Sequence, residues 1–200
     1  MTQYDFMLAF GLISGLLSAY AFLPYAIDTL YGRTRPQRAS WFIWSVLASI
    51  SLVAQIAEGA GASLWFAGVQ TAGTAIIFLI GLWRGVGGVG SWTDICVLTG
   101  AALGLVLWSV TDAPAYALLT SIGISCLGGS VTVWKAYKSP ESETLTTWMT
   151  CFVASACAML AVGTVDWLLL AYPIYLLVLN GAIVMAIMLG RRRGLVALPA

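Results

Sequence analysis

The stretch PYAIDTLYGRTRPQRASWFIW, from Pro24 to Trp44, decides the fold because it returns later in the chain. A weaker copy, GGSVTVWKAYKSPESETLTTW, runs from Gly128 to Trp148. Without a gap, the two stretches superpose at an offset of 104 residues (148 − 44), so that Trp44 meets Trp148. Each copy is the end of an apolar segment, a short basic loop and the start of another apolar segment. Internal repetition fixes architecture before any single element does. The repeat predicts one structural unit that is used twice.

The composition is typical of a membrane protein. Hydrophobic residues make up 60% of the 200 residues and charged residues only 8%, with a mean hydropathy of +0.94. A soluble domain carries about 25% charged residues. The net charge of +1 gives no reason to expect a nucleic acid as partner. The four cysteines lie in apolar segments without the spacing of a zinc site or a disulfide framework, so we expect them to be small packing residues.

Seven segments are long and apolar enough to cross a bilayer, which takes about 20 residues. Ser40, Ser63 and Thr93 are the predicted N-caps of three of them, and Pro114 opens a fourth. The predicted spans are near 6–31, 40–57, 64–83, 93–110, 115–134, 145–163 and 167–190.

Charge predicts the orientation of these spans. All nine Lys and Arg residues fall in alternate connections, and the connections between them hold acids and no base. Cytoplasmic loops are the ones enriched in Lys and Arg. The N-terminus is therefore predicted outside and the C-terminus in the cytoplasm. The bases are Arg33, Arg35, Arg38, Arg84, Lys135, Lys138 and Arg191 to Arg193, and the acids of the other connections are Glu58, Asp112 and Asp166.

Repeat and orientation together predict an all-α fold of three, one and three helices. Both copies of the basic loop face the same side, so the two three-helix units must be parallel, and one extra crossing makes that possible. We expect residues 1–91 to form the first unit, 92–112 a linker helix, and 113–200 the second unit with a basic tail. Parallel repeats of this kind bind a solute at their interface near the bilayer midplane in transport proteins.

The chain resembles the PQ-loop superfamily, which includes the SWEET sugar transporters and lysosomal amino-acid exporters. The resemblance covers nearly the whole chain: the three-one-three topology, a proline in the inner half of helix one, and a basic loop before a Ser-Trp helix start. Pro24-Tyr25 occupies the place of the family's Pro-Gln pair, and Gly128-Gly129 occupies it in the second unit. The segment SWFIW, Ser40 to Trp44, also resembles the Trp-x-x-Trp element of nicotinamide riboside transporters. The resemblance implies a seven-helix transporter.

Two matching helix faces are the first candidates for solute binding. Trp44, Ser51 and Gln55 share one face of helix two, and the offset of 104 gives Trp148 and Ser155 on helix six. Two indoles on either side of the symmetry axis would clamp a small solute by stacking. Alternatively, the two indoles belong to the aromatic belt at the membrane surface.

Polar groups at membrane depth are the second set of candidates, because they cost free energy there unless paired. Gln70 in helix three and Asn180 in helix seven offer amide donors and acceptors to an uncharged solute. They would otherwise join helices by hydrogen bonds. Asp28 in helix one either couples transport to protons or anchors the cytoplasmic end by pairing with Arg33 or Arg35.

The sequence thus predicts an integral membrane transporter of a small polar, uncharged solute, sugar-like or vitamin-like, that works by alternating access. Pro24 and the pair Gly128-Gly129 are the predicted gating hinges. The alternative is a non-transporting receptor or sorting protein with the same fold. The chain has no histidine, no cysteine dyad and no phosphate loop, so we expect no enzyme, no cofactor and no metal. The partners expected are the solute, the lipid bilayer and, as an open option, further copies of the chain.

Overall fold

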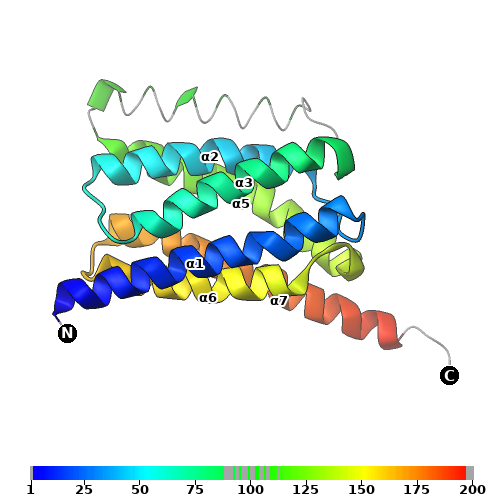
Figure 1. The fold of residues 1–200 in the computed structure, drawn as a ribbon. Helices are drawn as coiled ribbons and strands as arrows, with labels where there is room; N and C mark the ends of the chain where they lie inside the picture. The colour runs from blue at the N-terminus through cyan, green and yellow to red at the C-terminus, as the bar shows by residue number, and fades with distance from the viewer. Residues whose placement is uncertain are drawn as a thin grey trace.

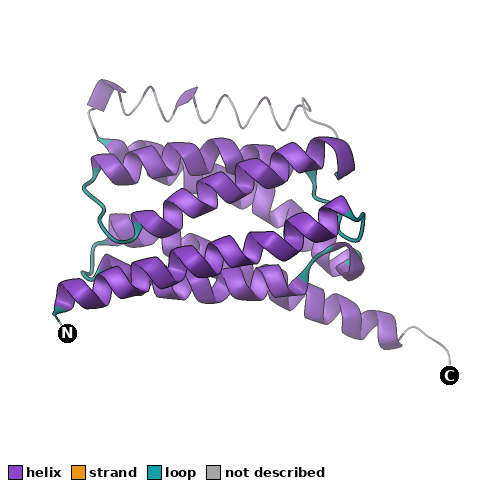
Figure 2. Ribbon diagram, in the orientation of Figure 1, coloured by secondary structure: helices purple, strands orange, loops and turns teal. Residues whose placement is uncertain are grey.

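The computed structural model describes residues 2–87 and 113–196 and scattered residues between 92 and 111. Throughout this part of the chain the fold is helical, without a β-strand (Figures 1 and 2). The predicted fourth span, 93–110, lies for the most part outside the described residues. The helices are α1 (Gln3–Leu30), α2 (Arg38–Ala57), α3 (Leu64–Arg84), α5 (Pro114–Lys138), the short 3₁₀ helix η1 (Pro140–Ser142), α6 (Leu145–Val162) and α7 (Trp167–Val196).

All six α-helices are long and apolar enough to cross a membrane. Helices suit that environment because a spanning segment must satisfy its own backbone hydrogen bonds. Six of the seven predicted spans thus have a helix at the expected place, so the all-α class is confirmed for the described residues, and the six apolar helices indicate a multi-pass membrane protein.

The helix ends follow from local sequence signals. Thr2 and Asp5 form a reciprocal capping box at the start of α1. Pro114 opens α5, as predicted. Gly163 ends α6 with a φ of +72°, a left-handed conformation that favours glycine. The prediction of Ser40 as an N-cap is wrong, because α2 begins two residues earlier, where the Arg38 backbone N–H is bonded to the Val86 carbonyl.

The six α-helices pack in a closed ring. α1 contacts α3 and α6, α2 contacts α3 and α5, and α7 contacts α5 and α6, so the order around the ring is α1, α3, α2, α5, α7, α6. α1, α3, α5 and α7 run in one direction and α2 and α6 in the other (Figure 1). The ring leaves room at its centre for a site to which every helix can contribute.

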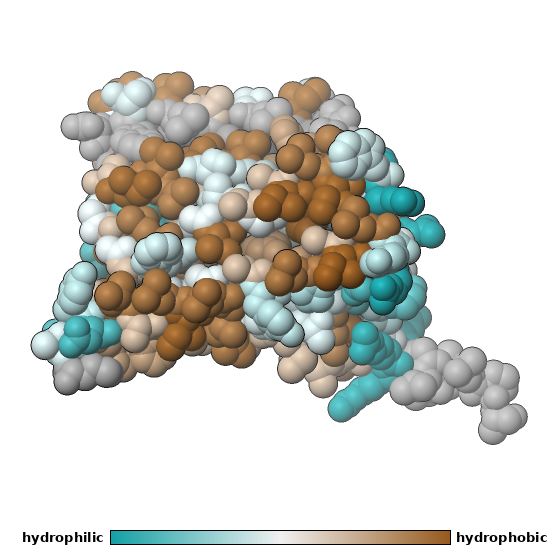
Figure 3. All heavy atoms as spheres, viewed as in Figure 1, coloured by the Kyte–Doolittle hydropathy of each residue, from teal (hydrophilic) through white to brown (hydrophobic). Residues whose placement is uncertain are grey.

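The two ends of the ring differ in charge. One end, called here the basic end, carries all nine Lys and Arg residues of the chain, and hydrophilic residues gather there while apolar residues cover the sides (Figure 3). Arg38, at the start of α2, joins this helix to the end of α3 and the segment after it by donating to the carbonyls of Gly81 and Gly87. The opposite end, the acidic end, carries Asp5, Glu58 and Asp166 among the described residues.

Glycines let the helices approach closely. A Cβ on Gly73 of α3 would clash with the Phe22 ring of α1, and a Cβ on Gly129 of α5 would lie 2.7 Å from Leu179 Cδ1 of α7. Small residues at such crossings allow the backbone contact by which helices associate in lipid, where the hydrophobic effect does not drive association.

Candidate functional site

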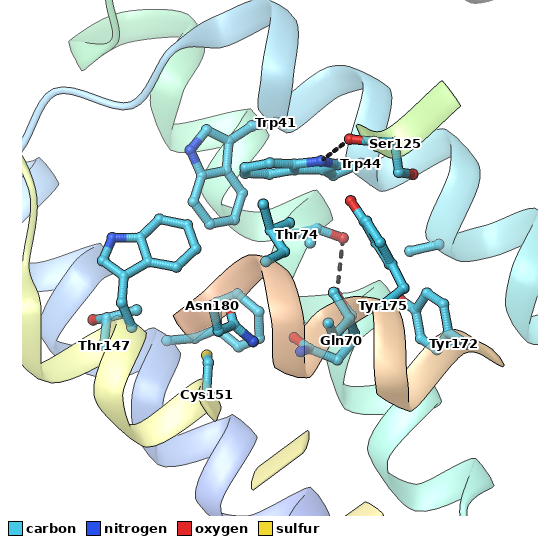
Figure 4. A pocket seen from close by; sticks show the side chains of 15 residues that line it. Trp41, Trp44, Gln70, Thr74, Ser125, Thr147, Cys151, Tyr172, Tyr175 and Asn180 are labelled. Atoms are coloured by element: carbon cyan, nitrogen blue, oxygen red, sulfur yellow. Dashed lines mark hydrogen bonds between the residues drawn. The ribbon is translucent and has the colours of Figure 1, made fainter. Parts of the chain in front are cut away.

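A cavity lies at the centre of the ring, and all six α-helices contribute to its lining (Figure 4). Its empty volume, counted out to its open mouth, is about 550 Å³. This volume suits a small molecule. Its lining comprises Phe22, Trp41, Trp44, Ala48, Gln70, Thr74, Ser125, Thr147, Trp148, Cys151, Tyr172, Tyr175, Leu176, Leu179 and Asn180.

Three indoles close the cavity on the side of the basic end. The ring centroids of Trp41 and Trp44 are 5.3 Å apart and nearly perpendicular, and Trp148 lies 6.3 Å from each. The Trp44 and Trp148 residues are only 8% and 4% exposed, so they face the interior and not a membrane surface. Tilted and edge-to-face contacts of this kind stabilise aromatic clusters and leave ring surface for a solute.

Amide groups lie across the cavity from Trp41 and Trp44 (Figure 4). The Asn180 Nδ2 donates to Ser155 Oγ at 3.2 Å, and Ser155 in turn donates to the carbonyl of Cys151. Within the described residues, neither the Asn180 Oδ1 nor the Gln70 amide makes a hydrogen bond, although both side chains are buried. These groups are available to a polar solute.

The cavity is electrically neutral. None of its described lining residues is Asp, Glu, Lys or Arg. A charged solute would have to shed its hydration without an opposite charge to receive it, which is costly in a buried site. The arrangement of rings and amides therefore suits an uncharged solute with hydrogen-bonding groups.

A buried carboxylate closes the basic end above the indoles. Glu143, 1% exposed at its side chain, accepts from Lys135 Nζ at 2.8 Å and from the Trp148 indole at 3.0 Å. The Tyr25 hydroxyl donates to it at 3.3 Å, and Lys135 Nζ also donates to the Arg35 carbonyl. This network, called here the Glu143 latch, joins α1 and the α1–α2 connection to α5 and α6.

The acidic end of the cavity has a different closure. Phe66 of α3 and Tyr172 of α7 meet there with ring centroids 6.5 Å apart, packed with Leu118 of α5. Within the described residues both ion pairs of the protein lie at the basic end, and none lies here. The two closures therefore differ in chemistry.

The structure brings four of the seven predicted binding residues together. Trp44, Trp148, Gln70 and Asn180 line the cavity. Ser155 does not line the cavity itself, but its hydroxyl accepts a hydrogen bond from the Asn180 amide, which does.

Ser51 and Gln55 lie elsewhere. Both are buried in α2 toward the acidic end, beyond the cavity, and the Gln55 amide donates to the Ser51 carbonyl of its own helix. The face of α2 that begins at Trp44 continues for three turns, but the cavity is shorter than the helix. Ser51 and Gln55 lie beyond its end, where they pack against other side chains and cannot contact a solute.

Asp28 and the glycine pair also lie outside the cavity. The Asp28 carboxylate accepts from Thr144 at 2.9 Å and lies 3.6 Å from Arg33, as in the anchoring alternative. Gly128 faces the Trp44 indole, and Gly129 faces Leu179, so both residues allow close helix contacts. Their roles in proton coupling and in gating remain predictions.

Sequence reasoning missed Trp41, Thr74 and the Glu143 latch. Trp41 precedes Trp44 by three residues and Thr74 follows Gln70 by four, so helical spacing placed both on faces already selected. The sequence signal for Glu143 was weaker. It is an acidic residue in a connection that carries basic residues, and it lies five residues before Trp148.

Comparison with known proteins adds no relative. No protein-family model matches the chain, and no curated protein is similar enough in sequence to count as a relative.

Proposed function

We propose that the protein is a membrane transporter that moves a small polar, uncharged solute by alternating access. The observation that carries the proposal is the neutral central cavity, which all six described α-helices line and which contains indoles and amide groups open to a solute. Ligand sites in membrane transport proteins lie at such a place, between repeated units and near the midplane.

Internal symmetry supports the proposal. Exchanging α1 with α5, α2 with α6 and α3 with α7 leaves the order around the ring unchanged. The Thr147 hydroxyl of α6 donates to the Ala21 carbonyl of α1, and the Trp44 indole of α2 points at the Ser125 carbonyl of α5. Ala21 and Ser125 are 104 residues apart, the offset of the repeat. We therefore propose two parallel three-helix units, joined by a linker helix near 93–110.

The Glu143 latch would be the cytoplasmic gate of this transporter. It bridges the two units through the hydrogen bonds from Tyr25 to Glu143 and from Lys135 to the Arg35 carbonyl, so the basic end can open only if both of these bonds break. The apolar closure at the acidic end can open without the loss of an ion pair among the described residues. Opening the two ends in turn would expose the cavity to each side.

The orientation can be tested by labelling. In a variant without native cysteines, single cysteines at Glu58, Asp112 and Asp166 are expected to react with an impermeant thiol reagent from outside the cell. Cysteines at Arg35, Lys138 and Arg192 should react only after the membrane is permeabilised, because basic connections stay in the cytoplasm. Labelling of intact cells at Lys138 with protection at Asp166 would contradict both the orientation and the parallel repeat.

A second test concerns the hinge in α1. Pro24 lies inside α1, where proline removes one helix hydrogen bond. Pro24→Ala restores that bond and is expected to slow turnover about tenfold while solute affinity stays within about twofold, as for a gating residue. The measurement is solute flux in reconstituted vesicles beside binding on the same preparation. Unchanged flux would exclude a gating role for Pro24.

The proposed function itself is tested by thermal stabilisation of the purified protein. A panel of uncharged sugars, nucleosides and vitamins is compared with charged amino acids and phosphorylated sugars. Binding at about a hundredfold excess over the dissociation constant adds about 2.7 kcal/mol of stability, which is readily measured. We expect hits among the uncharged compounds. Stabilisation by charged solutes alone would contradict the neutral-solute proposal.

A further inference from the structure

A second hollow lies on the outside of the ring, between α5 and α7. It backs onto the central cavity at Tyr175 and Leu179 but opens outward. Its walls are strongly exposed apolar side chains, with Trp134 62%, Val178 65% and Met185 60% exposed. Such a face is compatible with lipid and would be a liability in water.

The groove has the length of a lipid chain. Along α7 it extends from Tyr175 to Leu189, which at a rise of 1.5 Å per residue is about 21 Å. Half of the hydrocarbon core of a bilayer is about 15 Å thick. The groove therefore spans one leaflet, from near the midplane to the basic end. Small residues, among them Ala182 and Ala186, let a chain lie between the helices.

Cations stand at the end of the groove where a headgroup would lie. Lys138 Nζ is 4.7 Å from the centroid of the Trp134 ring, and Arg193 Cζ is 5.8 Å from that of Tyr137. Both rings line the groove, and their centroids are 6.3 Å apart. Neither cation has an ion pair within the described residues, and both are exposed.

The charge balance at this end of the groove is positive. Lys138 ends α5, and Arg191, Arg192 and Arg193 follow one another near the end of α7. η1 contacts both helices and contributes one exposed acid, Glu141. The nearby Glu143 is already paired with Lys135. Lys138 and Arg193 thus lie at the groove near one exposed acid, and Arg191 and Arg192 add positive charge to the same end, which favours an anionic group.

We propose that this groove binds an anionic phospholipid of the leaflet at the basic end. One acyl chain lies between α5 and α7, and the phosphate lies between Lys138 and Arg193. Basic pockets between transmembrane helices recognise anionic headgroups by this combination of charge and apolar contact. The site does not depend on transport and requires only that the helices span a membrane.

The test is lipid binding to the purified protein in dodecyl maltoside. Phosphatidylglycerol, at about a hundredfold excess over its dissociation constant, is expected to raise the melting temperature by about 5 °C or more. Phosphatidylcholine with the same chains should raise it by less than half as much, and glycerol 3-phosphate alone should not raise it. Native mass spectrometry is expected to count one retained phosphatidylglycerol per chain.

Three variants localise the effect. K138Q/R193Q should lose the preference for phosphatidylglycerol, whereas R84Q, which removes one positive charge from an exposed site at the same end, should keep it. A182F fills the groove and should lose retention of both lipids in native mass spectrometry. Equal stabilisation by the two lipids, or an equal loss in R84Q, would overturn the proposal. So would full stabilisation by glycerol 3-phosphate, which would indicate an anion site without a chain.

Discussion

Replacing Lys135 with methionine is expected to lower the free energy of unfolding by about 3–5 kcal/mol, because removing one partner of a buried ion pair leaves an uncompensated charge. The remaining charge is the Glu143 carboxylate, which is almost fully enclosed beneath Lys135. Its other donors, the Trp148 indole and the Tyr25 hydroxyl, are neutral and do not replace an ammonium group. Denaturant unfolding of the purified protein, without added lipid, measures the loss.

Two further variants show whether the loss comes from the latch. The double variant Lys135→Met/Glu143→Gln removes both charges and is expected to recover most of the stability, because a buried pair can often be replaced as a whole at little cost. Lys138→Met removes an exposed lysine three residues away and should cost less than about 1 kcal/mol. A Lys135→Met loss as small as that of Lys138→Met would mean that Glu143 is not held as a buried charge.

Asn180→Leu is expected to reduce solute affinity at least a hundredfold, that is by about 3 kcal/mol. The change removes the free Asn180 Oδ1 from the cavity and puts an isobutyl group where the solute makes hydrogen bonds. A site that binds polar groups rejects a solute strongly when those groups are left unpaired. The measurement is the dissociation constant of a solute found by thermal stabilisation, taken beside the melting temperature of the same variant.

Gln55→Leu is the matched control for Asn180→Leu. Gln55 is likewise a buried amide in a spanning helix, but its hydrogen bond stays within α2 and it does not line the cavity. Solute affinity should therefore stay within about threefold of the original protein. If Asn180→Leu lowers the melting temperature and leaves affinity intact, Asn180 serves only to join α7 to α6 through Ser155.

Sequence reasoning placed the helices well because the signals for them are local. Apolar runs of sufficient length mark the helices, and Pro114 opens α5, whatever lies across from them. The basic residues were equally informative, since they mark the end of the ring where hydrophilic residues gather (Figure 3). The apolar runs and the positions of the basic residues can both be read from the sequence without knowledge of tertiary contacts.

The site was predicted only in part because its boundaries depend on how far the cavity extends along each helix. Helical spacing selected a face of α2 that includes Trp44, Ser51 and Gln55, but it carries no information on where the cavity ends along that face. Ser51 and Gln55 lie past that end. The Glu143 latch was missed for a related reason. Lys135 lies in the last turn of α5 and Glu143 follows η1 eight residues later, and only the fold of the connection between α5 and α6 brings them within 2.8 Å.

The measurement that tests alternating access most directly is a pair of spin-label distances, one across each end of the ring, in lipid nanodiscs. Labels at Tyr31 and Glu141 report on the basic end, and labels at Ala57 and Thr164 report on the acidic end; all four positions are exposed. Lys135→Met is expected to lengthen the distance at the basic end and to shorten the one at the acidic end, because it removes the Lys135 bond to the Arg35 carbonyl and so weakens the bridge between the two units. Distances that stay the same at both ends, in the variant and with bound solute, would contradict transport and favour a receptor with a static cavity.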